Sequence, residues 1–199
     1  VSGPFGATRY LKQMISVVKY ATIPARWVLA ICYWCFASVT FAQPDGDLLQ
    51  KLQFADAGEA ARIERRLEQI WSRSGSASVD VLLKRGIDAL EAEQFAAAIE
   101  HLTAVIDHAP QFAEGRHRRA QAYFSVNLFG PAVADLERCL ALNPNHFGAL
   151  RGLAGIFEQL RMPVRALEVY QAFLAIHPEH RAVRSARDRL QHAVQGGKV

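Results

Sequence analysis

Alanine and proline recur in the second half of the chain at one fixed interval. Ala98, Ala132 and Ala166 lie 34 residues apart. The same 34-residue step relates three prolines, Pro110, Pro144 and Pro178. A constant period of this size indicates supersecondary units that stack on one another, because a single unit is too small to bury its own apolar face. The sequence therefore predicts a repeat array with no insertion between its copies.

A second set of small residues, Gly86, Ala120 and Ala154, has the same period. Large residues precede each of them, and an alanine, a large residue and the proline follow. This order resembles the tetratricopeptide repeat (TPR) family over residues 79–180, in copies at 79–112, 113–146 and 147–180. The resemblance implies an all-α, right-handed stack of antiparallel helix pairs. The small residues would lie where two helices approach closely, so larger side chains there would push the pair apart.

Each copy is expected to contain two helices, and we place these at 79–92 and 95–108, 113–126 and 129–142, and 147–160 and 163–176. Pro131 and Pro163 fall in the first turn of their helices, where a missing amide hydrogen has little effect. Residues 181–194 have one apolar side and predict a C-terminal capping helix, followed by a tail at 195–199. Three repeats are the smallest array expected to be stable, which explains the need for caps.

An N-terminal helical hairpin is predicted at residues 43–72. Leu48, Leu52 and Ala55 recur at helical spacing, Gly58 interrupts the run, and Ile63 and Leu67 begin a second apolar stripe. Since this segment is out of phase with the repeat, we interpret it as a capping unit that covers the first repeat. Residues 73–78 have no apolar period and are expected to be a linker.

The N-terminal region, residues 1–42, has the layout of a secretory signal. It carries four basic residues and no acid, and the run from Trp27 to Ala42 is free of charge. Sixteen residues is short for a spanning helix, which needs roughly 20. Two interpretations stay open: a cleaved signal peptide, or an uncleaved membrane anchor formed by residues 27–42. The net charge of +4 equals the charge of this region, so the remainder is neutral and no nucleic-acid partner is expected.

Catalytic, metal and cofactor signatures are not found in the sequence. His177 and His180 have an HxxH spacing, but Pro178 lies between them, so no metal site is expected. Cys139 is expected to be a buried, inert thiol. The dense basic cluster from Arg116 to Arg119 points in several directions on a helix, and we expect a solvated face rather than an anion site. The chain is therefore expected to be neither an enzyme nor a cofactor protein.

The resemblance implies that a partner peptide or helix binds on the concave side, which the first helix of each repeat lines. The expected lining is apolar at one end and mixed polar at the other, and consists of Asp80, Leu83, Ile87, Leu90, Glu114, His117, Gln121, Phe124, Arg151, Gly155 and Glu158. Leu83 and Ile87 stand where carboxylate-binding family members carry polar residues, so an amphipathic partner segment fits better. The predicted function is an exported, periplasmic protein-interaction scaffold. The alternative is an accessory subunit anchored in the inner membrane with its repeats facing the periplasm; the partner and the oligomeric state are not predicted.

Overall fold

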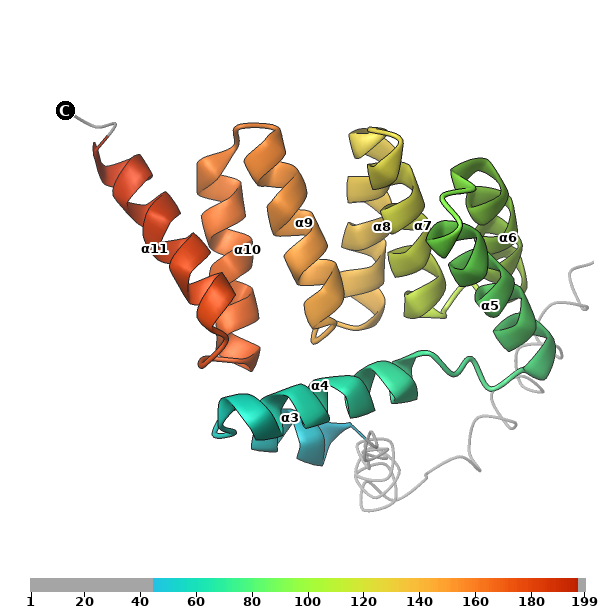
Figure 1. Ribbon diagram of the computed structural model, residues 1–199, viewed down its shortest axis with the longest axis horizontal. Helices are drawn as coiled ribbons and strands as arrows, with labels where there is room; N and C mark the ends of the chain where they lie inside the picture. The colour runs from blue at the N-terminus through green and yellow to red at the C-terminus, as the bar shows by residue number, and fades with distance from the viewer. Residues whose placement is uncertain (1–44, 197–199) are drawn as a thin grey trace, which may run out of the picture. The chain divides into compact units, whose positions relative to one another are not determined.

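The computed structural model describes residues 45–196, and within this range it contains nine α-helices and no strand. Successive helix pairs lie side by side in the order of the sequence (Figure 1). Two helices precede the array and one follows it. The elements are α3 (Gly46–Leu52), α4 (Ala57–Trp71), α5 (Ala77–Glu91), α6 (Phe95–His108), α7 (Ala113–Ser125), α8 (Phe129–Leu142), α9 (Phe147–Gln159), α10 (Pro163–Ile176) and α11 (Arg181–Gly196). The predicted all-α repeat fold is confirmed.

The turn inside each helix pair repeats one backbone conformation. Glu93, Asn127 and Arg161 lie 34 residues apart and have positive φ angles of 56°, 60° and 55°. In each turn the amide of the following residue donates to a carbonyl five residues earlier, for example Met162 to Phe157 at 2.8 Å. This is the Schellman arrangement that ends helices. None of the three positions is a glycine, so the sequence contains no glycine signal for these turns.

The small residues of the repeat lie where the two helices of a pair touch. Ala98, Ala132 and Ala166 are fully buried. A Cβ atom added to Gly86 would lie 2.6 Å from Leu102 Cγ, which is closer than real Cβ contacts come. The helices α5 and α6 can therefore approach only because residue 86 has no side chain. The three prolines of the period lie in the connections that follow α6, α8 and α10.

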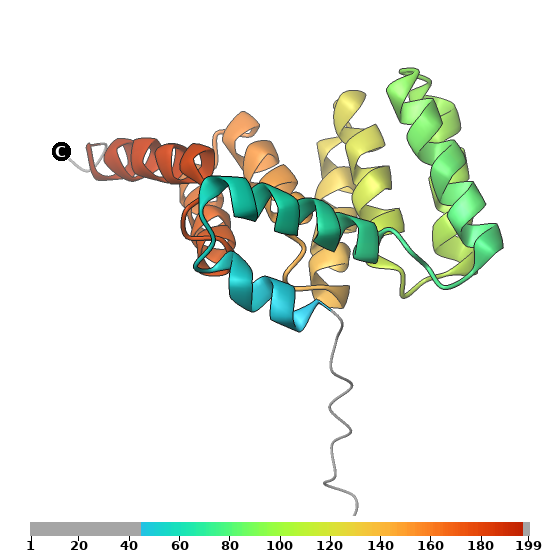
Figure 2. The same cartoon turned by 60° about the horizontal axis from the view of Figure 1, so that its bottom comes forward.

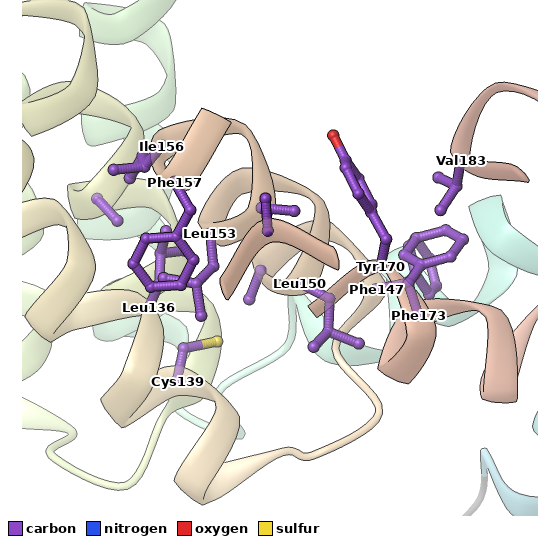
Figure 3. Packing of buried hydrophobic residues seen from close by; sticks show 14 of the residues in the cluster. Leu136, Cys139, Phe147, Leu150, Leu153, Ile156, Phe157, Tyr170, Phe173 and Val183 are labelled. Carbon is purple, nitrogen blue, oxygen red and sulfur yellow. The ribbon is translucent and has the colours of Figure 1, made fainter. Parts of the chain in front are cut away.

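The buried apolar side chains form two clusters. One lies mainly between α5 and α6 and includes Val79, Leu83 and Leu102. The second runs from α7 to α11 and also takes in the N-terminal hairpin. Figure 3 shows part of it, with Phe157 and Leu153 at one end and Phe173 at the other. Leu52 and Leu67 of the hairpin belong to this second cluster, so the hairpin shares a core with the last repeat.

The hairpin does not cover the first repeat, and that expectation is wrong. Trp71 at the end of α4 stacks on the ring of His146 at a centroid distance of 5.0 Å and contacts Phe147 at the same distance. His177 Nδ1, beyond α10, lies 3.0 Å from Glu64 Oε1 on α4. In both views α4 lies beside the ends of α9 and α10 (Figures 1 and 2). The hairpin therefore packs where α9 begins and where α10 ends.

The segment between α4 and α5 is held by a set of short polar contacts. Ser74 donates to Asp80 Oδ1 through its backbone amide at 2.8 Å and through its hydroxyl at 2.6 Å. Gly75 has a φ of +82°, a conformation that side chains disfavour. These contacts hold the chain where it turns from the hairpin into the first repeat.

The predicted leader, residues 1–42, lies outside the described residues. Between residues 45 and 196, none of the helices has the length and apolar character needed to cross a membrane.

Candidate protein-binding groove

A hollow opens between the first helices of the second and third repeats. Its volume is about 320 Å³, and α7 and α9 form most of its walls. Five of the predicted lining residues border it: His117, Gln121, Phe124, Arg151 and Gly155. The hollow brings these five together because α7 and α9 are equivalent helices of adjacent repeats and lie next to each other in the array.

The floor of the hollow is made of small and apolar residues. Gly152, Gly155, Ala120, Leu136 and Ile156 contribute to it. A Cβ atom added to Gly155 would meet no other atom within 4 Å, so this glycine leaves open volume rather than allowing a tight contact. An open, apolar floor of this size can accept one bulky side chain from outside.

The rim of the hollow has one fixed positive charge. Arg151 is exposed, and its guanidinium makes no ion pair with any of the residues in the described range. No aspartate or glutamate belongs to the lining. Phe124 lies at the opposite rim with 37% of its surface exposed and packs edge-on against Phe129 at 5.9 Å. The rim therefore favours a ligand that combines an apolar group with an anionic one.

Comparison with known proteins gives the same repeat. A tetratricopeptide repeat family model matches residues 83–129 and 117–181. The array matches the tetratricopeptide repeat family. A TPR repeat-containing protein of Rhizobium etli is 29% identical over 144 residues, which is 72% of this chain and 71% of that protein. TPR arrays are protein-interaction scaffolds.

Two solved TPR structures are similar in fold. The first TPR of Spaghetti (RPAP3) bound to an HSP90 peptide, SRMEEVD, has a TM-score of 0.56 and 22% identity, and covers 59% of this chain and 93% of that one. The TPR2B domain of yeast Sti1 in complex with an Hsp70 peptide has a TM-score of 0.56 and 21% identity, and covers 59% and 99%. At this identity the likeness concerns the fold alone.

The remaining predicted lining residues do not border the hollow. Leu83 is buried in the core of the first repeat, and Ile87 and Leu90 are half-buried against the same cluster. Asp80 binds Ser74, as described above. Glu158 accepts a hydrogen bond from the Tyr170 hydroxyl at 2.7 Å and pairs with Arg189 of α11. Of the predicted lining, only the part between the second and third repeats therefore borders a hollow.

Glu114 is also withdrawn from the surface, and it is the centre of a buried polar network. Its Oε2 atom lies 2.8 Å from His146 Nε2 and 3.3 Å from His117 Nδ1. Its Oε1 atom accepts from Arg118 Nε at 2.5 Å. Burial acts to raise the pKa of Glu114, but the hydrogen bonds from the two histidines and the charge of Arg118 lower that pKa below its ordinary value.

The three residues Glu114, His117 and His146 also present the donor types of a metal site, with ligand atoms within 4.8 Å of one another. The other hydrogen bonds of these residues favour a proton, and not a metal ion, between them. The amide of Ala149 donates to His146 Nδ1 at 3.1 Å, so the ring proton belongs on Nε2, the atom that faces Glu114. A metal bound at Nε2 needs that proton on Nδ1. The network is therefore complete as a set of hydrogen bonds that joins the second repeat to the third.

The arginines of the basic cluster at residues 116–119 are half-buried and paired with carboxylates, so the expectation of a solvated face is wrong. Arg119 makes a bidentate pair with the buried Asp135 of α8, at 2.7 and 2.8 Å. Arg116 lies 3.6 Å from the same carboxylate, and Arg118 pairs with Glu114. The expected burial of Cys139 is confirmed; burial, with the nearby carboxylates, raises the pKa of its thiol to about 12. Arg118 reaches Glu114 one turn earlier on α7, whereas Arg116 and Arg119 reach across to Asp135 on α8, a contact that local spacing does not identify.

Proposed function

We propose that this chain is a non-enzymatic scaffold that binds a peptide or helix of a partner protein in the hollow between α7 and α9. The observation that carries the proposal is the open floor at Gly155 beside the guanidinium of Arg151, which has no ion-pair partner among residues 45–196. If this space served only the internal packing of the protein, one of its own side chains would occupy it. TPR neighbours in complex with peptides support a protein as the ligand.

The lining defines the chemistry of the partner segment. One large aliphatic or aromatic side chain would occupy the apolar floor, and a neighbouring carboxylate would pair with Arg151. The Ser125 hydroxyl at the rim donates to the Gln121 carbonyl at 3.1 Å and can still accept a hydrogen bond from a peptide amide. An acidic amphipathic segment meets these requirements, and a basic segment would place like charges together at Arg151.

Export is part of the proposal and rests on the sequence alone. The acid-free basic segment followed by the charge-free run at residues 27–42 supports translocation to the periplasm. If this run stays in the bilayer, the same scaffold is an inner-membrane-anchored accessory subunit. A mature N-terminus near Gln43 in the purified protein would distinguish the first form from the second.

The binding test uses residues 43–199, because both hydrophobic clusters lie inside this unit. A displayed peptide library is selected on the protein, and the enriched peptides are measured by calorimetry. Gly155→Leu should fill the floor and weaken binding by roughly tenfold to a hundredfold, the value of one buried aliphatic side chain. Arg151→Glu should weaken acidic peptides and spare those that lack an acid.

Gly130→Leu is the matched control, since Gly130 is another helical glycine with no atom within 4 Å of an added Cβ and lies outside the hollow. Equal binding by the parent, Gly155→Leu and Arg151→Glu would refute the groove as the working surface. Enriched peptides without a large apolar residue would refute the assigned partner chemistry.

A further inference from the structure

A second and larger hollow lies between α3 and α4, apart from the groove. Its volume is about 530 Å³, and its lining includes Asp47, Leu48, Lys51, Arg66, Ile70 and Arg73. We call it the cationic cleft. Leu52 and Leu67 of the same helices do not line it, because they are fully buried in the core.

Three cations converge on the cleft and one carboxylate opposes them. Lys51, Arg66 and Arg73 make no side-chain hydrogen bond or ion pair with any residue from 45 to 196. The arginines of α7 are used differently, since Arg116, Arg118 and Arg119 are held by buried carboxylates. The charges of the cleft are therefore available to an external anion.

Apolar side chains accompany these charges. Phe54, in the turn between α3 and α4, is 83% exposed, and it borders a shallow hollow that Glu59 also lines and that shares Lys51 with the cationic cleft. Leu48 and Ile70 line the cleft and are half-buried. Exposed aromatic and aliphatic groups beside cations are the composition of surfaces that lie at the interface of a bilayer.

The position of the hairpin in the sequence indicates that the anion belongs to a membrane lipid and not to an acidic protein. Helix α3 begins at Gly46, four residues after the charge-free run ends at Ala42. Four residues of extended chain span at most about 14 Å, so any membrane contact of that run holds the cleft close to the headgroups. An acidic protein would satisfy the charges but would give no reason for the exposed Phe54.

We propose that the cationic cleft binds the phosphate groups of anionic phospholipids, with Phe54 inserted among the headgroups. The site is independent of the partner groove, because the two share no residue and lie on different elements. The hairpin thereby orients the array on a membrane surface while the groove stays free for a protein.

The test is sedimentation of residues 43–199, without the apolar run, with vesicles of phosphatidylcholine alone or with phosphatidylglycerol added. The parent should bind only the anionic vesicles, and binding should weaken with salt. Neutralising two cations in Arg66→Gln/Arg73→Gln should weaken binding about 25-fold, at about fivefold for each cation near the surface. Phe54→Ser should weaken binding with the charge unchanged.

Arg85→Gln/Arg138→Gln is the control, because it removes the same charge from exposed positions outside the cleft and should bind as the parent does. Equal loss in both double variants would overturn the cleft as the site. Equal binding to the two kinds of vesicle would overturn the role of the phosphate. Binding to polyglutamate or to inorganic phosphate without binding to vesicles would overturn the lipid as the ligand. Thermal melts of all variants exclude unfolding as the cause.

Discussion

The bidentate pair between Arg119 and Asp135 is the contact on which we expect the joint inside the second repeat to depend most. Asp135 is buried, and it faces the guanidinium groups of both Arg119 and Arg116. Asp135→Ala would leave two largely buried cations without their carboxylate. Removing one partner of a buried pair typically costs about 3–5 kcal/mol, and we expect about 3 kcal/mol because both arginine side chains keep some contact with water.

The assay is urea unfolding of residues 43–199 followed by circular dichroism, with thermal melts beside it. A loss of about 3 kcal/mol should lower the Tm by about 6–12 °C in a chain of this size. Glu137→Ala is the control on the same helix, since Glu137 forms an exposed pair with Arg165 at 3.5 Å and should change stability by less than about 0.5 kcal/mol.

A double variant separates charge from packing. Arg119→Met/Asp135→Leu removes both members of the pair, so it should recover part of the stability that Asp135→Ala loses. Equal losses in Asp135→Ala and Glu137→Ala would refute the assignment of Asp135 as the buried anchor. A double variant that loses as much stability as Asp135→Ala, or more, would show that an uncompensated charge is not the cause.

Three further predictions concern the buried network, the helix contacts and the hairpin. Burial lowers the pKa of His117 below its unfolded value of about 6.5, so the unfolded chain binds more protons than the folded one. The free energy of unfolding should therefore fall as the pH is lowered from about 7.5 to 5.5. His117→Asn should flatten this pH profile, measured by urea titrations. Ala132→Leu should destabilise by about 1–3 kcal/mol through overpacking, measured as a shift in the urea midpoint. Trp71→Ala should destabilise by about 2 kcal/mol and raise hydrogen exchange in α3, α4 and α9 while sparing α6, whereas a rise in α5 and α6 alone would contradict the observed packing.

The period alone predicts the helices of the array to within a few residues. Helix α6 has the expected bounds, and α7 ends one residue before its expected end. Local spacing suffices here because each repeat contacts its neighbours in sequence and its small residues fix where its helices touch. The conformation of the turns at Glu93 and Asn127 could not be predicted from the sequence, because backbone hydrogen bonds and not a glycine set the left-handed conformation there.

Part of the lining of the candidate groove could be predicted from the sequence, and one of the residues that does not border it shows why the rest could not. His117, Gln121 and Arg151 border the hollow because they lie on equivalent faces of adjacent first helices. Glu114 was expected on the same face, but its partner His146 lies 32 residues away, a separation outside the repeat period. A side chain that bonds to a partner so far away in the sequence is buried at that contact and does not remain on the surface. The position of a residue on a helix predicts the direction of its side chain. Whether that side chain is exposed depends on all the residues that pack around it.

The packing of the hairpin on the last repeat determines the order in which the core can be completed. A repeat array has a low contact order, because its contacts join near neighbours in sequence. The pair between Glu64 and His177 joins residues 113 positions apart and adds contacts of a different kind. At a synthesis rate of about 5–20 residues per second, the hairpin waits roughly 6–23 seconds for its binding surface to appear. During that interval the apolar face of the hairpin lacks part of its native contacts, since Trp71 finds His146 and Phe147 before His177 is made. The core of an emerging chain therefore stays incomplete, and accessible to chaperones or a translocation channel, until its C-terminal helices are made.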